Sequence, residues 1–230
     1  MSQQLIFTND VTRQLDALIA ASGSNRVFVI ADNNTASLVL PRLLKGNKQL
    51  ADATIITITS GDTNKTLDSV AGVWKQLSDG GATRSSLVVN VGGGMVTDLG
   101  AFAAATFKRG LRFINVPTTL LAAVDASVGG KTGFNFNGFK NEIGLFREAD
   151  AVVISTCFFD TLPVEELKSG YAEMLKHGFL TSAKECNDLM STDITQIAAD
   201  RMLTLLERSV KVKRDIVAQD PTEHGIRRAL

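Results

Sequence analysis

The chain has 230 residues, with 24 Lys or Arg against 24 Asp or Glu, so its formal net charge is zero. This balance gives no reason to expect nucleic acid or an anionic membrane as a partner, and no stretch approaches the roughly 20 apolar residues of a membrane span. The first ten residues lack the pattern of a signal peptide and the two cysteines form no CxxC motif, so we expect a cytoplasmic protein.

Short apolar runs predict strands at residues 27–31, 54–59, 87–91, 111–116 and 151–154. None of these runs alternates polar with apolar residues, and helical patterns separate them. Such strands are typical of a parallel sheet that is covered by helices on both faces. We therefore predict a doubly wound, mainly parallel α/β domain over residues 1–160.

Helices are expected between these strands. Pro41 should disturb the first of them. Asn64 is expected to cap the helix that follows the second strand, and Gly80-Gly81 to close it. The apolar residues of that helix recur at helical spacing: Leu67, Val70, Val73, Trp74 and Leu77.

Beyond Thr161 only helical patterns follow, and Pro163 makes a plausible helix start. One pattern ends at the break Asp220-Pro221 and includes Ile194, Ile197, Ala198, Met202, Leu205 and Leu206. We predict the beginning of an all-helical domain over residues 161–230, which the chain does not complete. The partners of the stripe formed by Met202, Leu205 and Leu206 would be missing helices, so we expect exposed apolar surface there.

Three consecutive glycines, Gly92 to Gly94, follow the strand at 87–91 and open a helix of small residues. Glycines let the backbone approach a pyrophosphate, and the helix dipole favours its negative charge. The match to GxGxxG is imperfect because Thr97 occupies the third glycine position, and many such turns are glycine-rich only for steric reasons. The place of this turn directly after a clear strand favours a dinucleotide site.

Residues 128–132 (VGGKT) invite comparison with a P-loop, but Asp125 stands where that motif needs its first glycine. A carboxylate in a phosphate cradle would repel the ligand, so we disfavour a nucleoside triphosphatase. Lys131 remains a candidate single-charge partner for a phosphate.

Glu166, Glu173, Lys176 and His177 share one face of the helix after Pro163. Taken alone, Glu173 and Lys176 are more simply a surface pair worth a few tenths of a kcal/mol. His177 is likewise more simply a structural residue than a ligand. A functional interpretation of this face needs further support.

The stretches VPTTLLAAVDASVGGKTG, KNEIGLF and SGYAEMLKHG resemble 3-dehydroquinate synthase, a lyase of the shikimate pathway. The similarity runs from about Asp32 to the last residue. It implies a Rossmann-like NAD domain followed by a helical domain, with the active site between them, usually in a homodimer. It also implies conversion of 3-deoxy-D-arabino-heptulosonate 7-phosphate to 3-dehydroquinate with loss of phosphate, in chorismate and aromatic amino acid biosynthesis. The implied cofactors are NAD and Zn²⁺, or another divalent metal such as Co²⁺.

Carried over residue by residue, the resemblance implies two sets of contacts. Those to NAD fall on Asp32, Asn34, Asp62, Lys65, Gly93, Gly94, Asp98, Thr118, Thr119, Lys131, Lys140, Thr161 and Glu166. Those to the substrate fall on Asp125, Lys131, Asn141, Lys176, Lys213, Glu223 and Arg227, with Arg109 supplied to the neighbouring subunit. Asp62 departs from the glutamate of the family. We expect Arg227 to grip a substrate carboxylate bidentately.

Glu173 matches one zinc ligand of the family. The two zinc histidines belong to a segment that should follow Leu230, and neither His177 nor His224 takes their place. Three protein ligands are the norm for a catalytic zinc. We therefore expect a truncated form of the synthase that is inactive or nearly so.

Two alternatives remain open. One is another sugar phosphate cyclase, such as 2-deoxy-scyllo-inosose synthase, and the other is an NAD-binding module without catalysis. A pure NAD binder would not need the basic and amide side chains of the substrate set, which argues against the second alternative.

Overall fold

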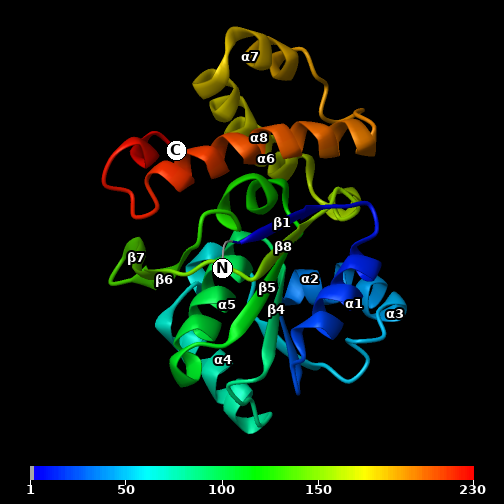
Figure 1. Cartoon of the computed structure of the whole chain (residues 1–230), viewed down its shortest axis with the longest axis vertical. Coiled ribbons are helices and arrows are strands. Elements are labelled where there is room, and N and C mark those ends of the chain that lie inside the picture. The colour runs from blue at the N-terminus through cyan, green and yellow to red at the C-terminus, as the bar shows by residue number, and fades with distance from the viewer. Residues whose placement is uncertain (1–2) are drawn as a thin grey trace.

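A six-stranded parallel sheet organises the computed structural model, which describes residues 3–230. The strand order is β1-β8-β5-β4-β2-β3, and every pairing in the sheet is parallel (Figure 1). The strands are β1 (Gln4–Phe7), β2 (Val27–Asp32), β3 (Thr54–Ile58), β4 (Leu87–Gly92), β5 (Arg112–Pro117) and β8 (Ala151–Ile154). The predicted doubly wound α/β fold is confirmed.

Helices cover both faces of this sheet. On one face lie α1 (Val11–Ser22), α2 (Asn33–Leu38) and α3 (Leu40–Gly46), and on the other lie α4 (Leu67–Asp79) and α5 (Gly94–Thr106). All residues of β4 are buried, as expected for a central strand with two covered faces. The chain breaks between α2 and α3, and Pro41 lies in the first turn of the second helix, which agrees with the disturbance that we expected.

The five predicted strands are not the complete set. β1 was missed, and so was an antiparallel hairpin of β6 (Lys131–Phe136) and β7 (Phe139–Phe146). The turn of this hairpin is Asn137-Gly138, and both residues have positive φ. Asn-Gly between apolar residues is a strong sequence signal for a hairpin.

Two predicted helix starts are wrong. Thr66 caps α4 by accepting a hydrogen bond from Ser69 N, whereas Asn64 lies in the preceding 3₁₀ turn η1 (Asp62–Asn64). The helix predicted from Ile194 begins later, as α8 (Ala199–Gln219). Its end before Asp220-Pro221 is confirmed.

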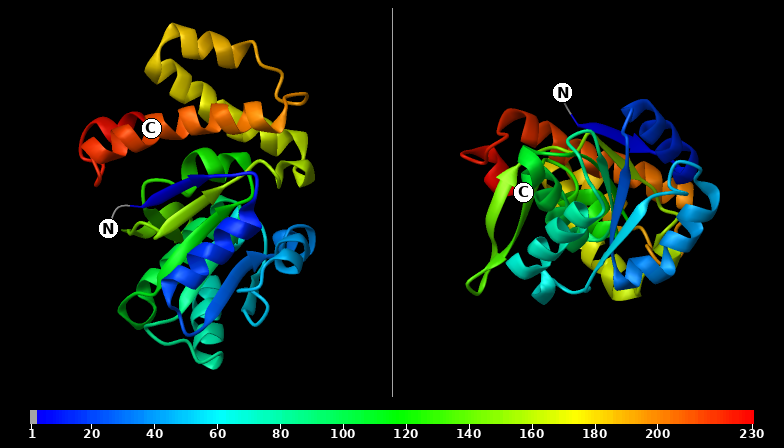
Figure 2. Two further views of the ribbon diagram at one scale, coloured as in Figure 1. Left: turned by 45° about the vertical axis from the view of Figure 1, so that its right-hand side comes forward. Right: turned by 90° about the horizontal axis from the view of Figure 1, so that it is seen from below.

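The helices after residue 161 pack over the carboxyl ends of the strands (Figure 2). They are α6 (Val164–Thr181), α7 (Ala183–Met190) and α8, followed by the short turn η5 (Ile226–Ala229). Both α6 and α8 contact a π-helical turn, η3 (Ala122–Ala126), which follows β5. The division of the chain near residue 160 remains a prediction. No helix within residues 3–230 combines the length and apolar character that crossing a membrane requires.

The expected exposed stripe on α8 is wrong. Met202, Leu205 and Leu206 are buried, because they belong to the core cluster that also holds Tyr171 and Met174 of α6. The exposed large apolar side chains of this part lie elsewhere, at Val164, Phe179, Leu180, Met190 and Ile226.

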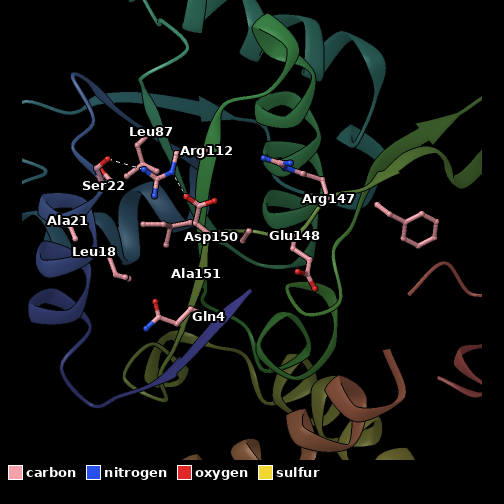
Figure 3. A pocket seen from close by; sticks show the side chains of 13 residues that line it. Gln4, Leu18, Ala21, Ser22, Leu87, Arg112, Arg147, Glu148, Asp150 and Ala151 are labelled. Atoms are coloured by element: carbon pink, nitrogen blue, oxygen red, sulfur yellow. Dashed lines mark hydrogen bonds and ion pairs between the residues drawn. The ribbon is translucent and has the colours of Figure 1, made fainter. Parts of the chain in front are cut away.

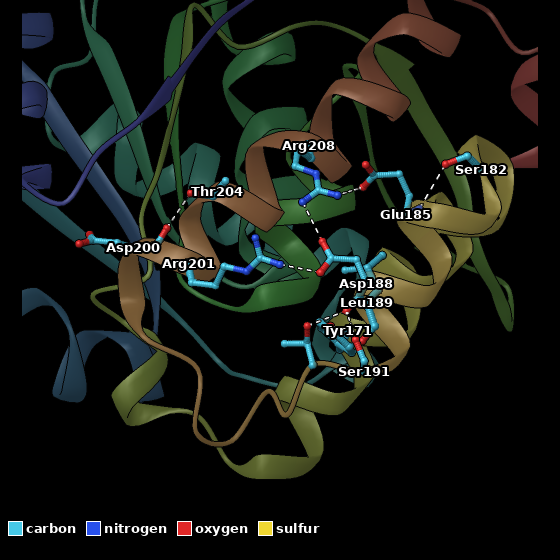
Figure 4. A network of polar contacts seen from close by, with 11 residues as sticks. Tyr171, Ser182, Glu185, Asp188, Leu189, Ser191, Asp200, Arg201, Thr204 and Arg208 are labelled. Carbon is cyan, nitrogen blue, oxygen red and sulfur yellow. Dashed lines mark hydrogen bonds and ion pairs between the residues drawn. The ribbon is translucent and has the colours of Figure 1, made fainter.

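Ion pairs fasten α7 to α8 (Figure 4). Arg208 binds Glu185 and also Asp188, and Arg201 donates to Asp188 at 2.6 Å. Tyr171 of α6 adds a hydrogen bond from its hydroxyl to the Leu189 carbonyl at 2.9 Å. These contacts hold the outer helices as one layer above the sheet.

Candidate active site

The glycine turn lies where the strand order reverses. From β2 the chain proceeds to β3 on one side and then crosses to β4 on the other, so a crevice opens between the carboxyl ends of β2 and β4. In open α/β sheets this position is where ligands bind. Gly93, the N-cap residue of α5, makes no side-chain cap hydrogen bond. A Cβ on Gly93 would lie 3.1 Å from Thr119 Cγ2, so the turn has little room for a larger residue.

The residues predicted to contact NAD lie mostly at this edge of the sheet. They lie at or after the carboxyl ends of five strands: Asp32 at the end of β2 and Asn34 after it, Asp62 and Lys65 after β3, Gly93, Gly94 and Asp98 after β4, Thr118 and Thr119 after β5, and Thr161 and Glu166 after β8. Lys131 and Lys140 come from the hairpin instead. The fold thus gathers residues that are far apart in the sequence along one edge.

Lys65 connects the two predicted sets. Its Nζ is 2.6 Å from Asp98 Oδ2 and 2.5 Å from Asn141 Oδ1, and its side chain is only 4% exposed. Burial raises the pKa of the Asp98 carboxyl, although the charge of Lys65 opposes this shift. At the surface, Lys140 Nζ lies 3.0 Å from Asp62 Oδ2, and this hydrogen bond lowers the pKa of Asp62.

A cavity of about 470 Å³ between the hairpin, η3 and the helical layer gathers the predicted substrate residues. Of the eight predicted positions, seven line it: Asp125, Lys131, Asn141, Lys176, Lys213, Glu223 and Arg227. Asp98, from the predicted cofactor set, lines the same cavity. The two predicted sites are therefore contiguous.

An ion pair in the lining of this cavity joins η3 to α8. Lys213 of α8 binds the Asp125 carboxylate, and its Nζ also donates to the Asp125 carbonyl at 2.7 Å. Burial alone would raise the pKa of Asp125, but the charge and hydrogen bond of Lys213 lower it below its ordinary value. Burial lowers the pKa of Lys213.

The two terminal nitrogens of Arg227 are already engaged within the protein. Its Nη1 donates to the Pro221 carbonyl at 2.5 Å and its Nη2 to the Gly129 carbonyl at 2.7 Å, and its guanidinium lies 5.6 Å from the centre of the Phe146 ring. Only 1% of this residue is exposed. Both ends of the fork are thus engaged by main-chain oxygens, whereas Lys131 reaches the cavity rim in an ion pair with Glu223.

Glu173 lies on α6 beside the cavity. Its Oε1 is buried and contacts Lys176 Nζ, and it lies 3.6 Å from His177 Nε2. His177 is itself buried, with Nδ1 2.8 Å from Ser209 Oγ, and burial lowers its pKa. Through Ser209 the ring packs against α8, while its Nε2 is buried without a hydrogen-bond partner.

Comparison with known proteins identifies the lineage. The model of the 3-dehydroquinate synthase N-terminal family matches residues 55–169, and that of the C-terminal family matches residues 170–230. A curated relative from Parabacteroides distasonis, named 3-dehydroquinate synthase, is 44% identical over 228 residues, which are 99% of this chain and 64% of the relative. The chain belongs to the 3-dehydroquinate synthase family.

Other relatives agree with this assignment. A 3-dehydroquinate synthase from Bacillus cytotoxicus is 38% identical and is covered over 55% of its length. The chain thus spans about three fifths of the curated relatives that it matches.

Solved structures share the fold. A 2-deoxy-scyllo-inosose synthase aligns with 98% of this chain and 63% of its own at a TM-score of 0.86 and 22% identity. The 2-epi-5-epi-valiolone synthase of Streptomyces hygroscopicus, solved with NAD⁺ and Zn²⁺ bound, aligns with 98% of this chain and 64% of its own at 0.80 and 26% identity.

The described residues do not by themselves fit a catalytic zinc. Among residues 3–230, no three His, Cys, Asp or Glu side chains gather closely enough to hold a metal ion. The single carboxylate of Glu173 falls short of the three protein ligands that such a site needs.

Arg109 lies away from the cavity. It ends the turn η2 (Phe107–Arg109), which follows the C-terminus of α5, whereas Asp98 lies near the N-terminus of that helix. At a rise of 1.5 Å per residue, Asp98 and the last residue of α5, Thr106, are roughly 12 Å apart along the axis. Its assignment to a neighbouring subunit stays a prediction.

A cavity larger than the predicted site lies elsewhere in the described residues. It has a volume of about 690 Å³ and lies at the amino ends of β1, β4, β5 and β8, the edge opposite the glycine turn (Figure 3). Arg112 is paired there with Asp150 and donates to the Ser22 carbonyl at 2.9 Å. None of the residues that we predicted for NAD, substrate or metal lines it.

Sequence reasoning missed Asn135 and Ser209, whose side chains bind predicted site residues and their neighbours. The hairpin signal at Asn137-Gly138 would have placed Asn135 on a strand that faces the loop after β3. No local pattern points to Ser209, because its partner lies 32 residues away.

Proposed function

We propose that this chain carries the NAD and substrate sites of a 3-dehydroquinate synthase, which converts 3-deoxy-D-arabino-heptulosonate 7-phosphate to 3-dehydroquinate with loss of phosphate. One observation carries the proposal: seven residues predicted for the substrate, drawn from distant parts of the chain, line a single cavity beside the predicted cofactor edge. The curated relatives bear the same name.

The charges of the cavity suit this substrate class. A sugar acid phosphate brings a phosphate and a carboxylate, and the cavity offers Lys131, Lys176 and Lys213. Each of these lysines is paired with an acid of this chain, so it is held in place before any ligand arrives. We infer that the substrate anions replace or extend these pairs, with Asn141 donating to a hydroxyl or phosphate oxygen.

The glycine turn fits NAD because it combines an uncapped helix N-terminus with a close approach to Thr119 at the switch point of the sheet. When bound there, NAD would supply a hydride acceptor and donor. Asp98 and Lys65 would then stand between the cofactor and Asn141. We also propose a cytoplasmic homodimer in which Arg109 serves the partner's site.

Glu173 is the one predicted metal ligand within the described residues, and no group of three candidate ligands surrounds it there. We expect the chain to retain no stoichiometric zinc after dialysis and to release no phosphate from the sugar phosphate. Another cyclase activity is less favoured, since the likeness to 2-deoxy-scyllo-inosose synthase, at 22% identity, speaks for the fold alone.

Calorimetric titration of NAD into the 230-residue chain tests the proposal. We expect saturable binding at one site, which Gly94→Val abolishes because the Cβ position of Gly94 already lies 3.2 Å from Ala126 Cβ. Gly72→Val, at an open position on α4, serves as the control. A folded chain that binds no NAD at millimolar concentration would refute the proposal.

A further inference from the structure

Asn135 stands at an irregularity of the hairpin. Phe134 pairs with Ile143 and Phe136 pairs with Phe139, so the register shifts between them. The backbone of Asn135 is thereby released from β7 and donates its N–H to the Lys65 carbonyl at 2.7 Å. Its side-chain Nδ2 donates to the Asp62 carbonyl at 2.9 Å. Asn135 therefore binds the loop after β3 through both its main chain and its side chain.

The other end of the same amide holds Asn141. Asn135 Oδ1 accepts the Asn141 N–H at 2.9 Å. Asn141 has a φ of 53°, a left-handed conformation that asparagine tolerates better than most residues with a Cβ. In this conformation the side chain of Asn141 reaches Lys65 Nζ, which also binds Asp98. A contiguous set of hydrogen bonds thus links the hairpin, the loop and α5.

We propose that Asn135 is a positioning residue that clamps the hairpin carrying Lys131 and Asn141 to the loop carrying Asp62 and Lys65. Only an amide fits the place, because one end must accept from Asn141 while the other donates to Asp62. The naming of the two sides as substrate and cofactor sides rests on the proposed function. The clamp itself rests on the contacts alone. Through this clamp, a ligand that binds the loop also restricts the motion of Asn141.

Amide hydrogen exchange at Asn141, followed by NMR in the ligand-free chain, tests the clamp. Asn135→Ala should accelerate this exchange about tenfold, the equivalent of one lost hydrogen bond. Asn135→Asp keeps an acceptor for the Asn141 N–H, so exchange at Asn141 should stay within about twofold of the wild type. It loses the hydrogen bond to the Asp62 carbonyl, because a carboxylate has no N–H to donate. Asn137→Gly, in the exposed hairpin turn where φ is 50°, is the matched control and should change nothing.

The same measurement with NAD tests the coupling. NAD should slow exchange at Asn141 in the wild type and in Asn137→Gly, and should fail to do so in Asn135→Asp even where calorimetry shows it bound. Unchanged ligand-free exchange in Asn135→Ala, or full protection by NAD in Asn135→Asp, would overturn the clamp. If Asn135→Ala does not fold, Asn135→Asp decides. If NAD binds to no variant and not to the wild type, the proposed function fails, and the ligand-free exchange still decides the clamp.

Discussion

Two lysine–aspartate pairs lie side by side in this protein and behave in opposite ways. Lys65 with Asp98 belongs to the cofactor edge, and Lys213 with Asp125 joins η3 to α8. The pKa of Asp98 is raised by burial, whereas the pKa of Asp125 is lowered by Lys213 in spite of burial. An ion pair therefore does not by itself say whether the folded state favours a charged carboxylate.

The surroundings explain the difference. The Asp98 side chain is 19% exposed and that of Asp125 is 34% exposed, so Asp98 loses more of its hydration. The negative charge of Asp125 raises the pKa of Asp98 further, whereas the charge of Lys176 further lowers the pKa of Asp125. We infer that the folded state favours the charged form of Asp125 and disfavours that of Asp98, while the burial of Lys213 offsets part of what the Asp125 pair contributes.

The largest expected effect comes from removing one partner of the Asp125 pair. Lys213→Met should lower the free energy of unfolding by about 3 kcal/mol, because it leaves Asp125 without its cation. Lys211→Met, two residues away in an exposed pair with Asp215, should cost no more than about 0.5 kcal/mol. Urea denaturation measures both, and equal losses would show that the pair adds nothing specific.

A second test concerns the close contact between α6 and the two residues that precede η3. A Cβ on Gly170 would meet the backbone nitrogen of Leu121 and lie 2.7 Å from Leu120 Cβ, so Gly170→Ala should cost about 2 kcal/mol. Gly72→Ala, on α4 with open space around it, should instead stabilise the chain by about 0.5–1 kcal/mol. Thermal unfolding of the two variants would contradict this account if both shifts had the same sign.

Asp98→Asn should lower the free energy of unfolding at pH 7 by about 1 kcal/mol, less than Asp125→Asn does, because it removes a charge that burial disfavours but leaves the buried Lys65 without its anion. Asp125→Asn should destabilise. Urea denaturation of both variants compares the two losses, and a loss in Asp98→Asn as large as that in Asp125→Asn would place the two pairs in the same class.

The pH dependence should differ in sign. Asp125 contributes stability that is present above its unfolded pKa of about 3.9 and is lost as the pH falls through its lower folded value. The deficit of Asp125→Asn should therefore shrink below about pH 4. Asp98 has a raised pKa, so its ionisation costs stability as the pH rises through that value, and the deficit of Asp98→Asn should grow as the pH falls and Asp98 becomes protonated. Denaturation at pH 3–7 measures both trends.

Much of the sheet follows from local pattern. Runs such as residues 87–91 are apolar throughout because both faces of the strand are buried, and the glycine turn follows directly from such a run. β1 and the hairpin were not predicted. β1 has only 4 residues, and every residue of β7 is exposed. Such strands carry little of the apolar pattern by which buried strands are recognised.

The sequence by itself determined the parallel sheet, the place of the glycine turn and the family, because these depend on residues that are neighbours along the chain. Only the tertiary structure decided that Asp125 binds Lys213, 88 residues away, and that Met202 is buried. It also turned Arg227 onto main-chain carbonyls. Such contacts depend on which elements meet, since a charge or an apolar stripe finds its partner only when packing brings distant segments together.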